Sequence, residues 1–200
     1  MIRFCFFIAC FLAVSATQGQ WKVGIYGGGL ISKLTAEEDK DYQTKFRLGY
    51  NANLYLETKV TPFFGVSFEP GFLVKGSKVD YNGIEYTSSV QYLNMPVLAN
   101  LHFLKIVTLA AGPEFSFLAQ ENYKGDVDNV DFNKEDFNDV EICGLFALYL
   151  SPLPKLDLGL RYSFAVTNSG NLKRKDVAGF IEENATQAEY VQLVLRVRFN

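Results

Sequence analysis

Histidine and cysteine are scarce in this sequence, which excludes several kinds of chemistry. His102 is the only histidine among 200 residues, and the cysteines are Cys5, Cys10 and Cys143. A zinc site needs several Cys or His ligands at close spacing, and a nucleophile-histidine-acid triad needs a histidine that an acid orients. We therefore predict no catalytic residue, no metal ligand and no cofactor site, and we expect a protein that is not an enzyme.

Charged residues are also few, and neither sign predominates strongly. They make up 20% of the chain and leave a formal charge of -3 at pH 7. Because nucleic-acid binding normally needs a basic face, we expect no nucleic-acid partner. Aromatic residues are plentiful instead, with 18 Phe, 11 Tyr and 1 Trp. This composition excludes an intrinsically disordered acidic or basic chain.

The N-terminus carries an apolar run that is too short to span a membrane as a helix. The run covers the 11 residues Phe4–Val14, follows Arg3 and precedes the small and polar stretch SATQGQ. A transmembrane helix needs about 20 apolar residues, so the pattern predicts a secretory signal peptide over 1–19, cleaved after about residue 16 to 19. The mature chain, 20–200, then keeps only Cys143 and has no intramolecular disulfide.

Apolar and polar residues alternate with period 2 along most of the mature chain, which predicts β-strands. In 47–57, for example, Leu48, Tyr50, Ala52, Leu54 and Leu56 share one face, and mostly polar residues share the other. Six segments show this pattern clearly, and 21–30 and 140–150 show it less regularly. The eight predicted strands are 21–30, 47–57, 64–75, 92–103, 106–120, 140–150, 155–166 and 188–200.

Long and short connections alternate between these strands. The long polar ones are 32–45, 76–89, 121–139 and 168–187, and the short ones are 59–62, 103–106 and 151–155. An antiparallel up-and-down meander of this kind places the long loops at one end and the tight turns at the other. Strands of about 10 residues with one apolar face have transmembrane dimensions. We therefore predict an all-β fold, one eight-stranded transmembrane β-barrel domain over 20–200.

The polar faces distinguish a membrane barrel from a soluble one. A soluble periplasmic lipocalin-like binding barrel would turn its apolar face inward and its polar face to water. The abundance of Gly, Asn and Arg on the polar faces favours the membrane barrel, in which these faces fill a narrow lumen and opposite charges pair. The predicted structural charge network of the lumen comprises Arg47, Glu57, Glu69, Glu114, Glu141, Asp157, Arg161, Arg196 and Arg198.

Three prolines, Pro70, Pro96 and Pro113, lie inside predicted strands. Proline has no N–H to donate to a neighbouring strand, and it is normally confined to edges or bulges. A closed barrel has no edges, so we expect bulges or strand breaks at these positions.

Four motifs of the mature chain form a recognisable set: a Tyr-Leu-x-x-Pro core, a Gly-Pro pair, the segment LDLGLRYSFAVTN and a closing strand that ends near an aromatic residue. Their defining residues are Tyr92, Leu93, Pro96, Gly112, Pro113, Arg161, Tyr162, Asn168 and Phe199. In these motifs the chain resembles the small outer-membrane β-barrel proteins of the PorT-like family of Gram-negative bacteria. The chain differs from the family pattern at Asn94, where Glu is common, and at Asn200, which follows the final aromatic residue.

The resemblance implies a barrel in outer-membrane lipid that the outer-membrane assembly machinery inserts. We favour a non-enzymatic integral outer-membrane protein whose four long external loops offer a binding surface. The alternative that the resemblance implies is a small pore or an accessory component of protein secretion or transport, with envelope or secretion proteins as partners. An ionic lumen could conduct ions, but eight strands leave little open space, which favours a structural plug. His102 has no partner nearby in the sequence and is interpreted as structural.

Overall fold

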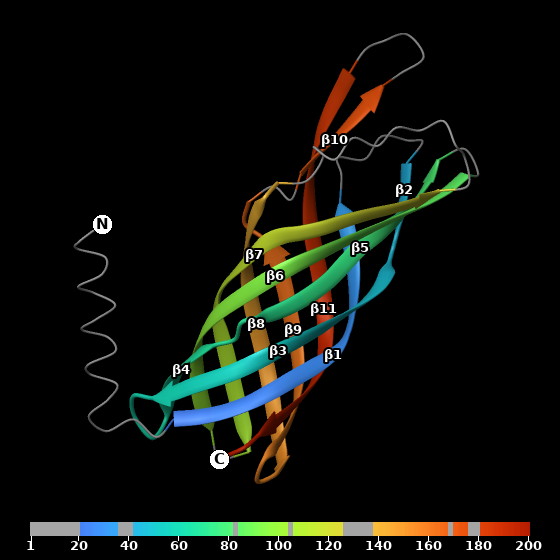
Figure 1. The fold of residues 1–200 in the computed structure, drawn as a ribbon. Helices are drawn as coiled ribbons and strands as arrows, with labels where there is room; N and C mark the ends of the chain where they lie inside the picture. The colour runs from blue at the N-terminus through green and yellow to red at the C-terminus, as the bar shows by residue number, and fades with distance from the viewer. Residues whose placement is uncertain are drawn as a thin grey trace, which may run out of the picture.

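The backbone follows the period-2 pattern of the sequence and forms antiparallel strands (Figure 1). The computed structural model describes residues 21–35, 42–81, 84–103, 106–125, 138–167, 170–175 and 181–200. The predicted signal peptide with its cleavage site and Asn168 lie outside these ranges. Within them, no helix is long and apolar enough to cross a membrane.

Eleven strands lie in the described ranges. Their bounds are β1 (Trp21–Thr35), β2 (Tyr42–Lys45), β3 (Arg47–Lys59), β4 (Phe64–Phe68), β5 (Gly71–Tyr81), β6 (Ile84–Phe103), β7 (Val107–Gly125), β8 (Val140–Leu153), β9 (Leu156–Ala165), β10 (Gly170–Lys175) and β11 (Ile181–Arg198).

The eleven strands form a closed barrel with eight walls. Two of the walls each consist of two consecutive strands, and one strand, β10, lies beyond the ring. β2 and β3 follow one another along one wall, and β4 and β5 form the next. β10 pairs with the part of β11 that precedes Ala188. The ring closes where β1 pairs with β3 on one side and with β11 on the other. The predicted fold class, an eight-stranded antiparallel up-and-down β-barrel, is confirmed.

The closing seam between β1 and β11 depends on glycine in β1. A Cβ atom added at Gly28 would lie 2.0 Å from the backbone carbonyl oxygen of Leu193 in β11. No other residue type avoids that overlap without moving a strand, so the glycine permits the close approach of the two backbones.

Of the three prolines inside predicted strands, Pro70 alone separates two strands, β4 and β5. Pro96 and Pro113 stay within β6 and β7, whose register is unchanged from Pro96↔Glu114 to Ala99↔Ala111. The expected bulge or break at these two positions is therefore wrong. A proline keeps its carbonyl group, and Pro96 O accepts a hydrogen bond from Glu69 N at 3.0 Å, which holds the strand in place. The register shift in this pair lies instead between Gln91 and Tyr92.

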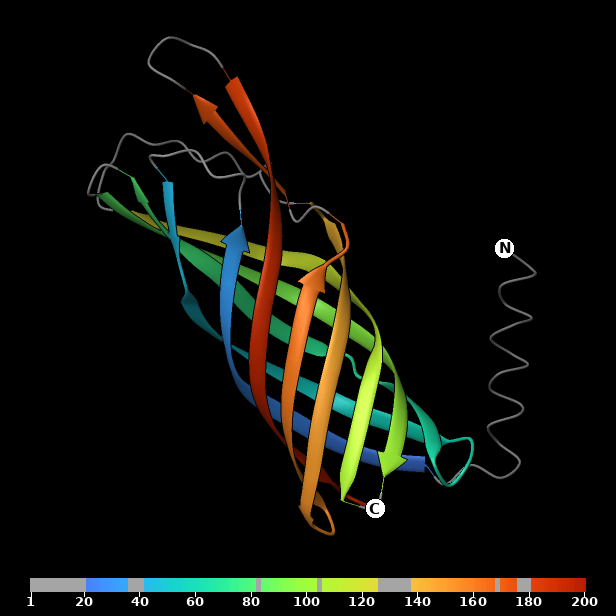
Figure 2. The ribbon, with the colours of Figure 1, turned by 180° about the vertical axis from the view of Figure 1, so that it is seen from behind.

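At one end of the barrel the strands run well past the predicted boundaries (Figure 2). β5 and β6 remain paired as far as Tyr81↔Ile84, inside the region 76–89 that was expected to be a loop. β10 and β11 likewise pair within 168–187. Apolar and polar residues alternate in a strand only where one face of the strand meets an apolar medium. A hairpin in water needs only paired backbone groups, so its sequence need not show this alternation. We call this the loop end.

Short turns join the strands at the opposite end, which we call the turn end. β3 and β4 pair up to Lys59↔Gly65, and the carbonyl oxygen of Phe64 accepts hydrogen bonds from Val60 N and Thr61 N, both at 3.0 Å. β8 and β9 meet at Leu153↔Leu156. The C-terminus also lies at this end (Figure 2).

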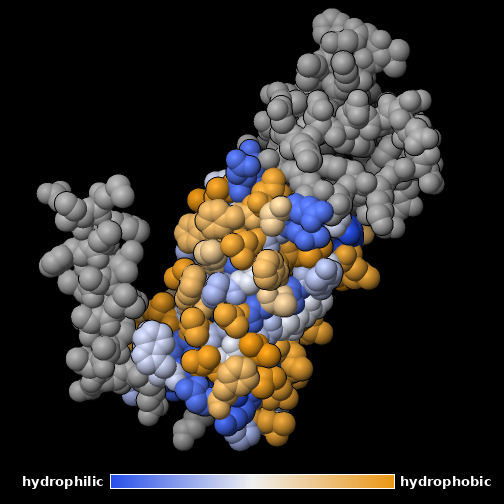
Figure 3. Space-filling model, in the orientation of Figure 1, coloured by the Kyte–Doolittle hydropathy of each residue, from blue (hydrophilic) through white to orange (hydrophobic). Residues whose placement is uncertain are grey.

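Side chains alternate between the lumen and the outer wall, with apolar groups outside. In β11, Leu193 is 67% exposed, whereas its neighbours Gln192 and Val194 are each 1% exposed. Apolar side chains cover much of the face of the barrel that is seen in Figure 3. An outer surface this apolar would be an aggregation site in water, and a soluble lipocalin-like barrel has the opposite arrangement. That alternative is therefore wrong.

We expect Leu193→Arg, in the middle of the lipid-facing part of β11, to lower the free energy of unfolding by roughly 2–4 kcal/mol, because it places a charge near the bilayer midplane. The matched control is Val166→Arg, since Val166 is also outward-facing but follows the end of β9. It should cost about 0–1 kcal/mol. Urea titration of the protein folded into lipid vesicles measures both values, and equal costs would contradict a lipid-facing belt.

Candidate functional site

The lumen contains buried ionic groups that pair across the barrel. Glu57 of β3 lies near the turn end and is fully buried. Its carboxylate accepts hydrogen bonds from Lys22 Nζ at 3.1 Å and from the hydroxyl of Tyr55, and it lies 2.5 Å from His102 Nε2. The other ring nitrogen of His102, Nδ1, lies 2.9 Å from Thr108 Oγ1. His102 therefore has two partners that its neighbours in sequence did not suggest.

A second carboxylate, Asp157 of β9, faces the same space from the opposite wall. Arg196 Nε donates to it at 2.7 Å and Arg198 Nη2 at 3.0 Å. The hydroxyl of Ser151 donates to it at 2.6 Å. Asp157 thus holds two arginines of β11 together near the turn end.

Deeper in the lumen, Arg161 of β9 and Glu69, between β4 and β5, form a pair at 2.9 Å. Both are almost completely buried, and Ser67 Oγ donates to the other Glu69 oxygen at 3.0 Å. Arg196 Nη1 is 4.0 Å from Glu69 Oε1, beyond hydrogen-bond distance. Arg161 and Glu69 come from opposite sides of the ring, so the pair links walls that do not share a ladder.

Toward the loop end, Lys75 and Glu141 form a further buried pair, with Lys75 Nζ 2.7 Å from both carboxylate oxygens. Cys143 Sγ donates to the same carboxylate at 3.1 Å. Glu114 accepts hydrogen bonds from the hydroxyl of Tyr190 and from Asn94 Nδ2, the latter at 3.4 Å. Lys75 was not among the predicted lumen residues, although it has the same parity in β5 as the lumen side chain of Leu73. That parity was the signal that could have identified it.

Tyrosine rings pack against the buried cations. The Arg196 guanidinium carbon lies 4.0 Å from the ring centroids of both Tyr55 and Tyr149. Arg161 lies over Tyr26, with 4.8 Å between guanidinium carbon and centroid. Such contacts stabilise a desolvated cation by about 2 kcal/mol or more. This role of the tyrosines was not predicted from the sequence, although Tyr55 shares its strand face with Glu57 and Asn53, which indicated a lumen position.

The nine predicted lumen residues lie inside the barrel or at its ends. Seven are buried, namely Glu57, Glu69, Glu114, Glu141, Asp157, Arg161 and Arg196. Arg198 is partly buried near the turn end. Arg47, also partly buried, donates through Nη1 to the carbonyl oxygen of Lys75 at 3.3 Å. The seven buried members and Arg198 each have a side-chain partner of opposite charge or a hydrogen-bonding tyrosine, through the contacts described above.

The residues of the PorT-like resemblance do not form one site. Tyr92 and Pro96 are buried, Leu93 is partly buried, and Pro113, Tyr162 and Phe199 are exposed. Gly112 has a packing role, because a Cβ atom there would lie 2.1 Å from the carbonyl oxygen of Val97.

The two departures from the family pattern also have structural roles. Asn94 accepts a hydrogen bond from Asn53 Nδ2 at 3.0 Å while donating to Glu114. Asn200 lengthens the seam, because its side chain accepts from Val23 N and donates to Trp21 O, both at 2.8 Å.

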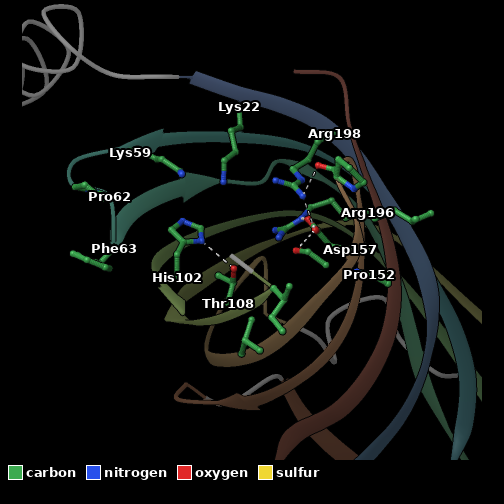
Figure 4. A pocket seen from close by; sticks show the side chains of 15 residues that line it. Lys22, Lys59, Pro62, Phe63, His102, Thr108, Pro152, Asp157, Arg196 and Arg198 are labelled. Carbon is green, nitrogen blue, oxygen red and sulfur yellow. Dashed lines mark hydrogen bonds and ion pairs between the residues drawn. The ribbon is translucent and has the colours of Figure 1, made fainter. Parts of the chain in front are cut away.

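A cavity of about 700 Å³ opens among these groups at the turn end (Figure 4). Its polar lining includes Lys22, Lys59, His102, Arg196 and Arg198. In the described part of the chain, no group of three or more His, Cys, Asp or Glu side chains could hold a metal ion. The arrangement offers positive charge and hydrogen-bond donors instead of a metal site.

The sequence matches the family model described as the outer membrane protein beta-barrel domain over residues 15–171. The chain belongs to this family. No protein in a search of curated proteins matches it.

Solved outer-membrane barrels share the fold at low sequence identity. Neisserial surface protein A matches with a TM-score of 0.53 and 9% identity, covering 88% of this chain and 97% of that one. Ail, the attachment invasion locus protein of Yersinia pestis, matches with a TM-score of 0.51 and 11% identity, covering 89% of this chain and 98% of that one. OprG from Pseudomonas aeruginosa matches with a TM-score of 0.50 and 7% identity, covering 92% of this chain and 98% of that one. These likenesses establish an outer-membrane β-barrel fold.

We expect Arg161→Met to lower the free energy of unfolding by roughly 3–5 kcal/mol, because it leaves the buried Glu69 carboxylate without its cation. The double variant Arg161→Met/Glu69→Gln removes both charges and should recover most of that loss. Urea unfolding of the three proteins in vesicles gives the coupling energy. Additive losses in the double variant would contradict a direct pair.

Proposed function

We propose that the protein is a non-enzymatic integral outer-membrane barrel with a structurally plugged lumen, whose loop end carries its binding surface. The observation that supports this best is the combination of an apolar outer wall with an ionic, tyrosine-packed interior. Away from the turn end, the interior side chains engage one another across the barrel, so packing and charge balance account for their arrangement there. The nine-residue charge network then serves to fill and rigidify the narrow ring.

The loop end supports a recognition role by its construction. The hairpins β5–β6 and β10–β11 continue beyond the apolar wall, so paired backbone holds polar segments away from the bilayer. Segments positioned by a rigid scaffold commonly carry binding residues. We propose that the ligand is bound there, on the cell exterior.

We further propose the route by which the protein reaches the membrane. Its N-terminal signal peptide directs export, the outer-membrane assembly machinery inserts the barrel, and outer-membrane lipid surrounds it. The PorT-like group is the branch of the family that the motifs favour. Envelope or secretion proteins are then the partners to test, and a small pore or secretion accessory is the alternative function.

Electrical recording in planar bilayers separates a plug from a pore. We expect the wild-type barrel to show no discrete conductance steps, because the buried pairs and tyrosines occupy the lumen. Reproducible single-channel steps that change in size in Arg161→Ala would contradict the plug and favour the pore. Slower migration on a denaturing gel after boiling than before serves as the control that each preparation contains folded barrel.

Epitope tags test which end faces outward. A tag inserted within 126–137 should be labelled by antibody on intact cells, because long connections of such barrels face the exterior. A tag between Pro154 and Lys155, in the turn between β8 and β9, should be labelled only after the outer membrane is permeabilised. The reverse pattern would place the loop end in the periplasm and remove the proposed external binding surface.

A further inference from the structure

The cavity at the turn end has more positive than negative charge. Lys22, Lys59, Arg196 and Arg198 all line it, and Figure 4 shows their side chains around it. They come from three neighbouring walls, β3, β1 and β11. The carboxylates that pair with these side chains are Glu57, the partner of Lys22, and Asp157, the partner of both arginines. Glu69 is also 4.0 Å from Arg196, but its charge is balanced by its nearer partner Arg161 at 2.9 Å. With His102 counted as neutral, four cations face two anions.

The surplus charge lies on groups with unused hydrogen-bonding capacity. The side-chain ammonium group of Lys59 has no hydrogen bond or ion pair with another described residue. Arg198 Nε and Arg196 Nη1 are buried, and neither has a hydrogen-bond partner among the residues that the structure describes. Buried donors of this kind are costly unless a ligand or another acceptor engages them. Lys59 and both arginines line the cavity.

We propose that this cavity binds a phosphate monoester that enters from the turn end, with Lys59, Arg196 and Arg198 as its ligands. Such a group carries a charge of about -1.5 to -2 at pH 7, which matches the excess of two cations, whereas a carboxylate supplies only one negative charge. Guanidinium groups also match the geometry of phosphate oxygens. A cavity of 700 Å³ can accommodate more than the phosphate itself.

Apolar residues at the cavity entrance extend the site beyond the charged centre. Phe63, Ile106 and Leu153 line the cavity and are 72%, 55% and 58% exposed. They belong to the turns or lie at the end of a strand, so they surround the opening. Both a soluble phosphorylated compound and the headgroup of a lipid with a terminal phosphate share the required chemistry.

Titration calorimetry on the full chain in maltoside micelles tests the site with three probes: inorganic phosphate, glycerol 3-phosphate and phosphatidic acid mixed into the micelles. We expect saturable binding that Lys59→Gln or Arg198→Gln weakens about tenfold, which corresponds to the loss of one charge-assisted contact. Lys155→Gln is the matched control, because Lys155 lies in the turn between β8 and β9 but does not line the cavity. It should change affinity by less than about twofold.

The probes distinguish the two sources of the phosphate. Binding of the soluble probes identifies a dissolved monoester, and binding of phosphatidic acid alone, still weakened by Lys59→Gln, identifies a lipid headgroup. Absence of saturable binding to all three probes would overturn the proposal, as would equal weakening by Lys155→Gln. Acetate, titrated in addition as a carboxylate comparison, would overturn it by binding more tightly than phosphate. A heat-dependent gel shift shows that each variant is folded. The result does not affect the proposed lumen plug or the proposed binding surface at the loop end, because neither depends on a ligand in this cavity.

Discussion

Each backbone N–H and C=O group within a bilayer must find its partner inside the protein, since hydrocarbon offers none. In this chain the antiparallel pairing of β1 with β11, from Gly24↔Arg198 to Thr35↔Gln187, meets that requirement, because without it both strands would have a free edge. Closure makes the ring narrow, and a narrow ring must be filled by its own side chains. The inward-facing side chains of the strands fill the ring, so the closure of the barrel at this seam determines which side chains must pack against one another in the lumen.

The filling is ionic, which adds a second constraint. A charge withdrawn from water is costly unless an opposite charge or a polarisable ring lies next to it. The pairs Arg161–Glu69 and Lys75–Glu141 join residues that are 92 and 66 positions apart in the sequence. They can form only when the barrel is closed, and they then connect walls that share no ladder. The turn-end cavity departs from this balance, because the positive groups around it exceed the negative ones.

Much of the architecture could be predicted from period-2 alternation. Leu193 and Gln192 are an example, because neighbouring residues of a strand point to opposite faces. The Leu193 side chain faces the lipid, and the Gln192 side chain faces the lumen. The rule failed where its physical basis is absent. Beyond the bilayer, β5 and β6 pair between polar segments, so no alternation marked their continuation to Tyr81 and Ile84. At Pro96 the rule against proline in a ladder failed because the carbonyl group of this residue still holds the neighbouring Glu69.

The fold class and the apolar face of each regular strand follow from the order of residues alone, because both depend on local order and on the two-residue repeat of a strand. The long-range partners of the buried charges became apparent only once the strands were arranged in the barrel. His102 meets Glu57, and Arg198 meets Asp157, because the stagger of the strands around the ring sets which side chains share a level. That stagger depends on all eight walls together, and no single segment of the sequence contains it.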